Sequence, residues 1–164
     1  MSEIKFCKDC GCVLGTRETL GRQRFNSLKR CPECQSIRRK LQKADLNDVA
    51  YLWLDINLKA HNFISAEYWN TNFEFVKEML PQAEVYVYEN DKKIQGFIGL
   101  NGEYIEGIFV AVEMQSRGIG KLLLDYAKDR KSKLLLKVYQ KNTRAVRFYQ
   151  REGFEIQSEG LDDD

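Results

Sequence analysis

The chain has 164 residues, which is enough for one ordinary domain or for a medium-sized domain with a small attachment, and excludes a large multidomain enzyme. Hydrophobic residues make up 43% and charged residues 30% of the sequence, as in a globular protein rather than a disordered or fibrous one. No apolar run approaches the roughly 18 residues that span a bilayer, and the N-terminus lacks the apolar stretch of a signal peptide. We therefore expect a cytoplasmic protein without membrane association.

The net charge of +2 is unevenly distributed along the chain. Residues 1–40 carry ten basic and four acidic side chains, a net charge of +6, whereas the remaining 124 residues carry 16 basic and 20 acidic ones, a net charge of −4. All five cysteines also lie within the first forty residues. This division predicts a small basic cysteine module at residues 1–36, followed by a larger acidic domain at residues 37–164.

The cysteine module contains two C-x2-C pairs, formed by Cys7 with Cys10 and by Cys31 with Cys34. Two such pairs about twenty residues apart are typical of a tetrahedral site for a structural Zn²⁺ ion. A metal would also supply stability that about forty residues cannot obtain from a core of their own. A rubredoxin-like iron site and a pair of redox dithiols are the alternatives, and Cys12 is a surplus thiol.

The segment with these cysteines resembles a zinc ribbon. Its basic residues, seven of them between residues 22 and 40, could contact nucleic-acid phosphates or an acidic protein. A solvated basic face without a partner is equally compatible with this composition.

The larger domain begins with one predicted strand and two predicted helices. Residues 37–42 have a weak strand pattern. Asp45 is placed to cap a helix whose apolar residues recur at helical spacing from Leu46, and Ser65 is placed to cap a second helix that Pro81 ends.

The pattern then changes to the alternation that is typical of strands. Three strands are predicted, at residues 83–88, 94–100 and 104–112. The dipeptides Asn90-Asp91 and Asn101-Gly102 between them favour tight turns, so the three strands are predicted to form an antiparallel meander.

The remainder of the chain alternates between helix and strand. The elements are a helix at 118–130, a short strand at 134–138, a helix at 142–152 and a strand at 154–156. The resulting order, β-α-α-β-β-β-α-β-α-β, predicts an α/β (α+β) fold with a mixed central sheet rather than a doubly wound one.

The stretch from residue 110 to 121 carries the strongest functional pattern, because a strand leads into a glycine-containing turn that opens a helix. Such a turn presents backbone N–H groups to an anion. A dinucleotide fingerprint would need glycine in place of Leu123, and a P-loop would need glycine in place of Gln115 and serine or threonine in place of Leu122. Neither nucleotide motif fits.

The residues from Gln115 to Gly120 form the pattern Q-x-x-G-x-G, and residues 142–149 form N-x-x-A-x-x-F-Y, followed by Gly153-Phe154. Together these two motifs resemble the GNAT superfamily of N-acetyltransferases, over residues 37–160. The resemblance implies an enzyme that transfers an acetyl group from acetyl-CoA by direct attack of a primary amine, on a small molecule or a protein. Family members usually continue into another hairpin, so we expect the last strand to be missing and an open sheet edge through which a homo-oligomer could form.

The resemblance also implies roles for individual residues. The residues that would contact acetyl-CoA are Phe109, Val110, Gln115, Arg117, Gly118, Ile119, Gly120, Lys121, Asn142, Ala145 and Phe148. Main-chain groups of residues 117–121 would hold the pyrophosphate, and those of Phe109 and Val110, where the family's strand bulges, would align the acetyl arm.

For catalysis, the resemblance implies that Tyr149 protonates the leaving thiolate. The general base is either His61, which is the one histidine of the chain, or Glu106. Phe63, Tyr68 and Trp69 could wall the acceptor pocket.

Two functions from different classes follow from these patterns. The first is an acetyl-CoA-dependent N-acetyltransferase with an N-terminal zinc ribbon. The second is a ribbon that binds nucleic acid or protein, fused to a CoA-binding domain with little turnover. A zinc-dependent hydrolase is disfavoured, because a four-cysteine site leaves no open coordination position.

Overall fold

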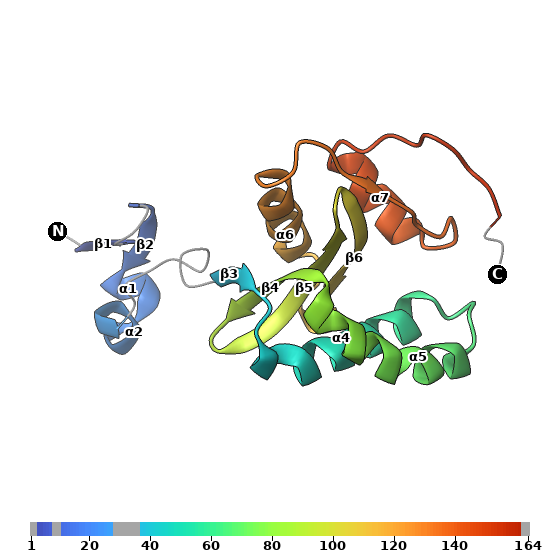
Figure 1. Ribbon diagram of the computed structural model, residues 1–164. Coiled ribbons are helices and arrows are strands. Elements are labelled where there is room, and N and C mark those ends of the chain that lie inside the picture. Colours follow the sequence, from blue (N-terminus) through green and yellow to red (C-terminus); the bar gives the residue numbers. More distant parts are fainter. Residues whose placement is uncertain (1–2, 8–10, 28–36, 162–164) are drawn as a thin grey trace.

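The computed structural model describes residues 3–7, 11–27 and 37–161, which contain a two-stranded sheet near the N-terminus and a separate five-stranded sheet (Figure 1). Among the described residues, no helix combines the length and the apolar character needed to cross a bilayer.

The N-terminal sheet is an antiparallel hairpin of β1 (Ile4–Phe6) and β2 (Val13–Thr16), followed by the short helices α1 (Arg17–Leu20) and α2 (Arg22–Ser27). The side chain of Thr16 caps α1 by accepting a hydrogen bond from the N–H of Thr19. Phe25 of α2 is buried, and the ammonium of Lys5 lies 5.0 Å from the centre of its ring. This small unit is therefore centred on one aromatic side chain.

The five-stranded sheet has the order β3-β4-β5-β6-β7. Its strands are β3 (Ile37–Lys40), β4 (Glu84–Asn90), β5 (Lys93–Asn101), β6 (Tyr104–Val110) and β7 (Leu135–Leu136). The first four strands are antiparallel to their neighbours, and β7 is parallel to β6. The predicted meander and the predicted mixed sheet are both confirmed.

Helices cover both faces of this sheet (Figure 1). They are α4 (Leu46–Ala60), α5 (Ala66–Met79), α6 (Ile119–Lys128) and α7 (Thr143–Arg151), together with 3-10 turns at Lys43–Asp45, Leu80–Gln82 and Val112–Met114. Ser65 caps α5 through the N–H of Tyr68, as predicted.

The alternation along the strands divides the core between the two faces. Val85, Val87 and Phe97 pack with Val49 and Ala50 of α4. On the opposite face, the apolar residues of α6 pack against residues such as Tyr88, Ile98 and Leu100. Consecutive side chains of a strand point to opposite faces, which is why one strand can pack against α4 on one face and against α6 on the other.

Two predicted strands differ from the structure. The strand expected at 134–138 is reduced to the two residues of β7, and the strand expected at 154–156 is absent from the described residues. The N–H of Phe154 donates to the carbonyl of Tyr149, and its ring lies 5.5 Å from the Tyr149 ring. Phe154 therefore follows the turn after α7 and is bonded back to that helix, although its apolar side chain reaches the core as a strand residue would.

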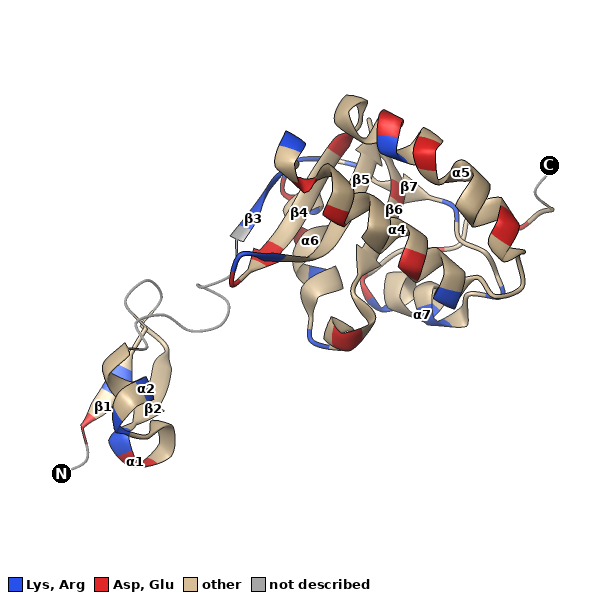
Figure 2. Cartoon of the chain, turned by 90° about the horizontal axis from the view of Figure 1, so that it is seen from below, with Lys and Arg blue, Asp and Glu red and all other residues tan. Residues whose placement is uncertain are grey.

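The predicted capping role of Asp45 is wrong. Its side chain makes no capping hydrogen bond to α4, and its carboxylate accepts instead from the guanidinium of Arg39, at 2.6 and 3.0 Å, and from the N–H of Gln42, at 2.7 Å. Arg39 also donates to Glu89 at 2.8 Å. Figure 2 shows the basic character of β3. The contacts of Arg39 with Glu89 and Asp45 attach this strand to β4 and to the start of α4.

Candidate active site

One edge of β6 is open over most of its length. β6 pairs with β5 as far as Val110, but it pairs with β7 only at Tyr104 and Ile105. Within the described residues, the edge of β6 from 106 to 110 that faces β7 has no strand partner. Exposed backbone groups on such an edge can pair with an extended ligand.

The bulge in β6 lies earlier than we expected. Gly99 pairs with Gly107 and Leu100 with Ile105, so that Glu106 has no residue opposite it. The prediction had the bulge at Phe109 and Val110. The Phe109 ring instead stacks on Phe97 with ring centres 4.7 Å apart. Its side chain thus belongs to the core, whereas its main chain lies on the open edge.

Gln115 connects β6 to the glycine-containing loop. Its side-chain amide donates to the carbonyl oxygen of Val110 at 3.0 Å, and the next N–H, that of Ala111, donates to Gln95 at 2.9 Å. The side chain of Gln115 therefore fixes the direction in which the chain leaves the strand.

The loop at residues 115–120 forms the N-terminus of α6, a helix of ten residues. Ser116 and Gly118 have positive φ angles of 62° and 84°, which turn the chain sharply before the helix. In the described part of the chain, no acceptor receives a hydrogen bond from the backbone N–H groups of residues 116–121. Unpaired N–H groups at the positive end of a helix dipole form a binding site for a phosphate-like anion.

The first half of α7 is attached to this loop. Arg144 donates to the hydroxyl of Ser116 at 3.0 Å. The Cβ position of Gly120 lies 3.4 Å from the ring of Phe148, so α6 and α7 are in contact at this point. Arg144 was not predicted, and only its position two residues after Asn142 could have suggested a role beside the loop.

Lys121 does not point its charge toward an open site. Its ammonium lies 3.1 Å from a carboxylate oxygen of Glu152 and 3.3 Å from one of Asp125. These carboxylates, Glu152 foremost, raise the pKa of Lys121 above its ordinary value. Of the predicted anion ligands, the backbone of residues 117–121 is thus better placed than this side chain.

Tyr149 is buried on α7, where its ring contacts Phe148 at 5.1 Å and Phe154 at 5.5 Å. Burial raises the pKa of Tyr149 well above its ordinary value. The phenol is protonated at neutral pH, as a proton donor must be, and its raised pKa makes it a weaker acid than an exposed tyrosine.

His61 takes part in a network of hydrogen bonds between α4 and the start of α7. The side-chain amide of Asn57 donates to the carbonyl of Trp53 at 2.9 Å, and its oxygen lies 2.9 Å from Nδ1 of His61. On the other side of the ring, Nε2 lies 3.2 Å from the amide nitrogen of Asn142. The oxygen of Asn142 accepts from the N–H of Ala145 and so caps α7. Asn57 was not predicted, and no sequence motif contains it.

An aromatic cluster surrounds the imidazole of His61. Trp69 stacks on it with ring centres 5.4 Å apart, while Phe63 and Tyr139 meet it edge-on at 5.7 and 5.0 Å. Burial among these rings lowers the pKa of His61 below its ordinary value. Tyr68 contacts Trp69 and is half exposed. The three aromatic residues predicted to wall the acceptor pocket are thus grouped around the predicted base, with Tyr139 as an addition.

Glu106, the other candidate base, is exposed on β6. Among the described residues it forms neither an ion pair nor a hydrogen bond with His61 or Tyr149. The structure therefore gives it no link to the groups that surround α7.

Of the predicted metal ligands, only Cys7 lies within the described residues. It is buried at the end of β1, its N–H donates to the carbonyl of Cys12, and its own carbonyl accepts from Gly11. Cys10, Cys31 and Cys34 lie outside the described residues. The part of the chain that the structure describes contains no group of three or more potential metal ligands.

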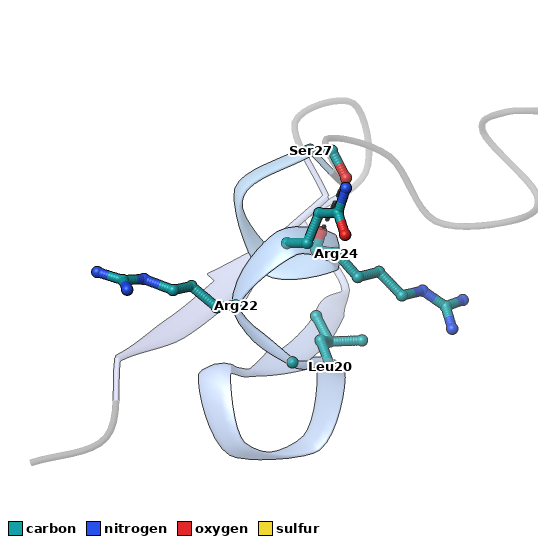
Figure 3. A pocket seen from close by; sticks show the side chains of 6 residues that line it. Leu20, Arg22, Arg24 and Ser27 are labelled. Atoms are coloured by element: carbon teal, nitrogen blue, oxygen red, sulfur yellow. Dashed lines mark hydrogen bonds between the residues drawn. The ribbon is translucent and has the colours of Figure 1, made fainter.

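For the predicted contact with nucleic acid, the basic side chains of α2 that the structure describes do not converge on one point. A shallow hollow beside α2 is lined by Leu20, Gly21, Arg22, Gln23, Arg24 and Ser27. Arg22 and Arg24 extend away from one another on its two sides (Figure 3).

Comparison with known proteins agrees with this geometry. The family model of the acetyltransferase (GNAT) domain matches residues 81–156. The peptidyl-lysine N-acetyltransferase YiaC of Escherichia coli K12 is 39% identical over 120 residues, which are 72% of this chain and 82% of YiaC. The peptidyl-lysine N-acetyltransferase YjaB of the same strain is 30% identical over 130 residues, 79% of this chain and 88% of YjaB.

The fold also matches a crystal structure of the PaiA N-acetyltransferase of Thermoplasma acidophilum in complex with coenzyme A. The TM-score is 0.68 with 21% identity, over 76% of this chain and 92% of that chain. At this identity the match concerns the fold. With the YiaC and YjaB relatives and the GNAT domain match, it leads to one conclusion: this chain belongs to the GNAT family of N-acetyltransferases.

Proposed function

We propose that this enzyme transfers the acetyl group of acetyl-CoA to the side-chain amine of lysine in a peptide or protein. The binding of acetyl-CoA is supported by one observation: the row of unpaired N–H groups at residues 116–121, next to the open edge of β6. A pyrophosphate fits the first feature and an extended pantetheine arm fits the second. The acceptor class is supported by YiaC and YjaB, both of which are peptidyl-lysine N-acetyltransferases.

The proposed binding mode uses both motifs. The loop holds the pyrophosphate through its backbone, with Arg117 and Arg144 adding positive charge at its rim. The pantetheine arm lies along residues 107–110 of β6 and reaches Asn142. Because the carbonyl of Val110 already accepts from Gln115, that group serves to orient the loop rather than the cosubstrate.

In the proposed reaction, the lone pair of the lysine nitrogen attacks the carbonyl carbon of the thioester. Backbone N–H groups on the open edge of β6 donate to the oxygen on which negative charge develops. The carbon–sulfur bond then breaks, Tyr149 donates its proton to the sulfur, and the proton lost by the lysine nitrogen goes to Nε2 of His61. Glu106 is the competing base, and its lack of a link to α7 places it second.

The aromatic cluster of His61, Phe63, Trp69 and Tyr139 is the proposed entry for the acceptor. The ammonium of Lys141 lies 5.5 Å from the centre of the Phe63 ring, so one face of the cluster accommodates a lysine side chain. Aromatic faces attract ammonium groups and also contact the apolar stem of lysine. A small-molecule amine is the competing acceptor.

The experiment that tests this proposal measures thiol release from acetyl-CoA with a panel of acceptors. We expect turnover with lysine peptides, loss of that turnover when the lysine is replaced by norleucine, and little turnover with polyamines or aminoglycosides. A preference for a small amine over every peptide would contradict the acceptor class. Failure to bind acetyl-CoA in calorimetry would contradict the whole proposal.

We further propose that Cys7, Cys10, Cys31 and Cys34 bind one structural Zn²⁺. The burial of Cys7 and the C-x2-C spacing of both pairs support this, since two such pairs are typical ligands of a structural Zn²⁺. Elemental analysis of freshly purified protein should give one zinc per chain, and iron or no metal would contradict the assignment. If the module also binds nucleic acid, the amount of polynucleotide that the protein retains should fall steeply as the salt concentration rises.

A further inference from the structure

The network around His61 determines which ring nitrogen carries the proton. The carbonyl of Trp53 can only accept a hydrogen bond, so the atom of Asn57 that faces it is the amide nitrogen, at 2.9 Å. The oxygen of Asn57 therefore faces Nδ1 of His61, at 2.9 Å. An oxygen acceptor at this position requires a proton on Nδ1.

The opposite side of the ring leads to the same result independently. The N–H of Ala145 can only donate, so the atom of Asn142 that faces it is the oxygen, at 3.2 Å. The amide nitrogen of Asn142 then faces Nε2 of His61, also at 3.2 Å. A donor at this position requires Nε2 to carry a lone pair and no proton.

The two ends of the network thus specify one neutral tautomer, with Nδ1 protonated and Nε2 unprotonated. From these contacts we propose that Asn57 is a positioning residue, which holds His61 in this tautomer and so keeps a basic nitrogen at the N-terminus of α7. Asn57 is 3% exposed, and one hydrogen bond anchors it to its own helix while the other reaches His61. This inference rests on the proposed function, because it assigns a partner to the proposed base.

Asn57 bonds both to its own helix and to His61, whereas another asparagine of the chain makes only the first kind of bond. Asn70 of α5 makes the same hydrogen bond to its own helix, from its amide nitrogen to the carbonyl of Ala66 at 2.8 Å. Asn70 is exposed and lies outside the network. A substitution there removes a local hydrogen bond without changing the acceptor for His61.

The position of Asn142 makes the availability of His61 as a base depend on whether acetyl-CoA is bound. In the cosubstrate-free state its amide donates to Nε2, the atom that must accept the proton from the lysine nitrogen. A pantetheine arm that recruits this amide leaves the Nε2 lone pair available. The base would then be released only after acetyl-CoA has bound.

Nitrogen-15 NMR of the full chain tests the inference directly, because the protein has a single histidine and its two ring signals need no assignment among residues. We expect the wild type at neutral pH to show a protonated Nδ1 and an unprotonated Nε2. A protonated Nε2, alone or together with a protonated Nδ1, would overturn the proposal without any variant.

Two variants at position 57 separate the acceptor from the packing. Asn57→Asp keeps an oxygen acceptor for Nδ1, so Nδ1 should stay protonated; because its carboxylate loses the bond to Trp53 and raises the pKa of His61, its tautomer is compared at a pH above that pKa. Asn57→Leu removes the acceptor for Nδ1 and leaves only the amide of Asn142 to favour the wild-type tautomer, so a fraction of the Nε2-protonated form should appear and kcat should fall by about tenfold or more, since a general base contributes at least that much. Acetyl-CoA affinity should change far less than kcat.

The outcomes remain informative if a variant folds poorly. Should Asn57→Leu fail to fold, the wild-type spectrum and Asn57→Asp still decide the tautomer. Asn70→Leu should leave both the histidine signals and kcat unchanged. An Asn57→Leu protein that keeps the wild-type tautomer, or keeps the wild-type kcat, overturns the role of Asn57. If the wild type has the expected tautomer but acetylates no lysine peptide, the proposed function fails while the placement of His61 stands.

Discussion

The guanidinium of Arg144 donates to the hydroxyl of Ser116 at 3.0 Å, which places a permanent positive charge beside the anion-binding loop. The two residues belong to different motifs, one at the start of α7 and one before α6. Their contact joins the two motifs into one site, because the loop that presents its N–H groups is held by the helix that carries Asn142 and Tyr149.

This contact predicts that Arg144 contributes to cosubstrate affinity. Arg144→Gln should weaken acetyl-CoA binding by about three- to tenfold in calorimetry, since an exposed charge-assisted contact contributes about 1 kcal/mol. Arg147→Gln is the matched control, because Arg147 is exposed one turn later on the same helix. Equal affinities of the two variants would contradict a role for Arg144 in binding.

The second prediction concerns Tyr149. Because its phenol is protonated at neutral pH and is the proposed proton donor to the thiolate, Tyr149→Phe should lower kcat by about a hundredfold while acetyl-CoA affinity stays nearly the same. The ring contacts with Phe148 and Phe154 are kept in this variant, so the melting temperature should change little. Steady-state kinetics and calorimetry on the same preparation check both expectations, and an unchanged kcat would remove Tyr149 as the proton donor.

The sequence predicted those elements whose determinants are local. The meander could be predicted since the period changes from helical to alternating after Pro81, although the turn expected at Asn90-Asp91 lies one residue later, at Asp91 and Lys92, both of which have positive φ angles. Ser65 could be predicted as a cap for the same reason, as its partner is three residues away. Asp45 failed as a cap because its carboxylate binds residues that precede it, the guanidinium of Arg39 in β3 and the N–H of Gln42, rather than the first turn of α4.

The candidate site was predictable where it is a motif and hidden where it depends on tertiary contacts. The loop at 115–120 was found because its glutamine and two glycines stand at fixed spacing within six consecutive residues. Asn57 was missed, since 85 positions separate it from Asn142 and only the fold brings them to the two sides of one imidazole. His61 was found only as a candidate by its residue type, and the structure adds its partners.

The third prediction concerns the pair of Arg39 and Asp45, which attaches β3 to the rest of the sheet. Their side chains are 22% and 10% exposed, so Arg39→Met leaves a carboxylate without its partner in a largely buried place. We expect a loss of about 2 kcal/mol in the free energy of unfolding. Lys59→Met is the matched control, because its ion pair with Asp55 is about half exposed and should contribute less than about 0.5 kcal/mol. Urea unfolding compares the two, and equal losses would contradict the role of the buried pair.

The same pair predicts an acid-dependent loss of stability. The guanidinium of Arg39 holds the pKa of Asp45 below its ordinary value of 3.8. A carboxyl group with a lowered folded-state pKa contributes its full stability above the ordinary pKa and loses it as the pH falls through the folded-state pKa. Asp45→Asn should therefore be less stable than the wild type at pH 7, and the difference should shrink below about pH 4. A difference that stays constant down to pH 2 would contradict this linkage.

The last prediction is the pH dependence of the reaction. Burial lowers the pKa of His61 below 6.5, and the groups that face its nitrogens, Asn57 and Asn142, are neutral. A base works only when unprotonated, so kcat/KM should fall on the acid side with a midpoint below pH 6.5 and be level at neutral pH. Burial of a neutral imidazole also makes folding stability fall as the pH drops below 6.5, because the unfolded chain binds a proton that the folded chain does not. His61→Gln should abolish this midpoint and lower the plateau, whereas Glu106→Gln should preserve both. If Glu106→Gln instead abolished the midpoint and His61→Gln preserved it, the base would be Glu106 and His61 would have a structural role.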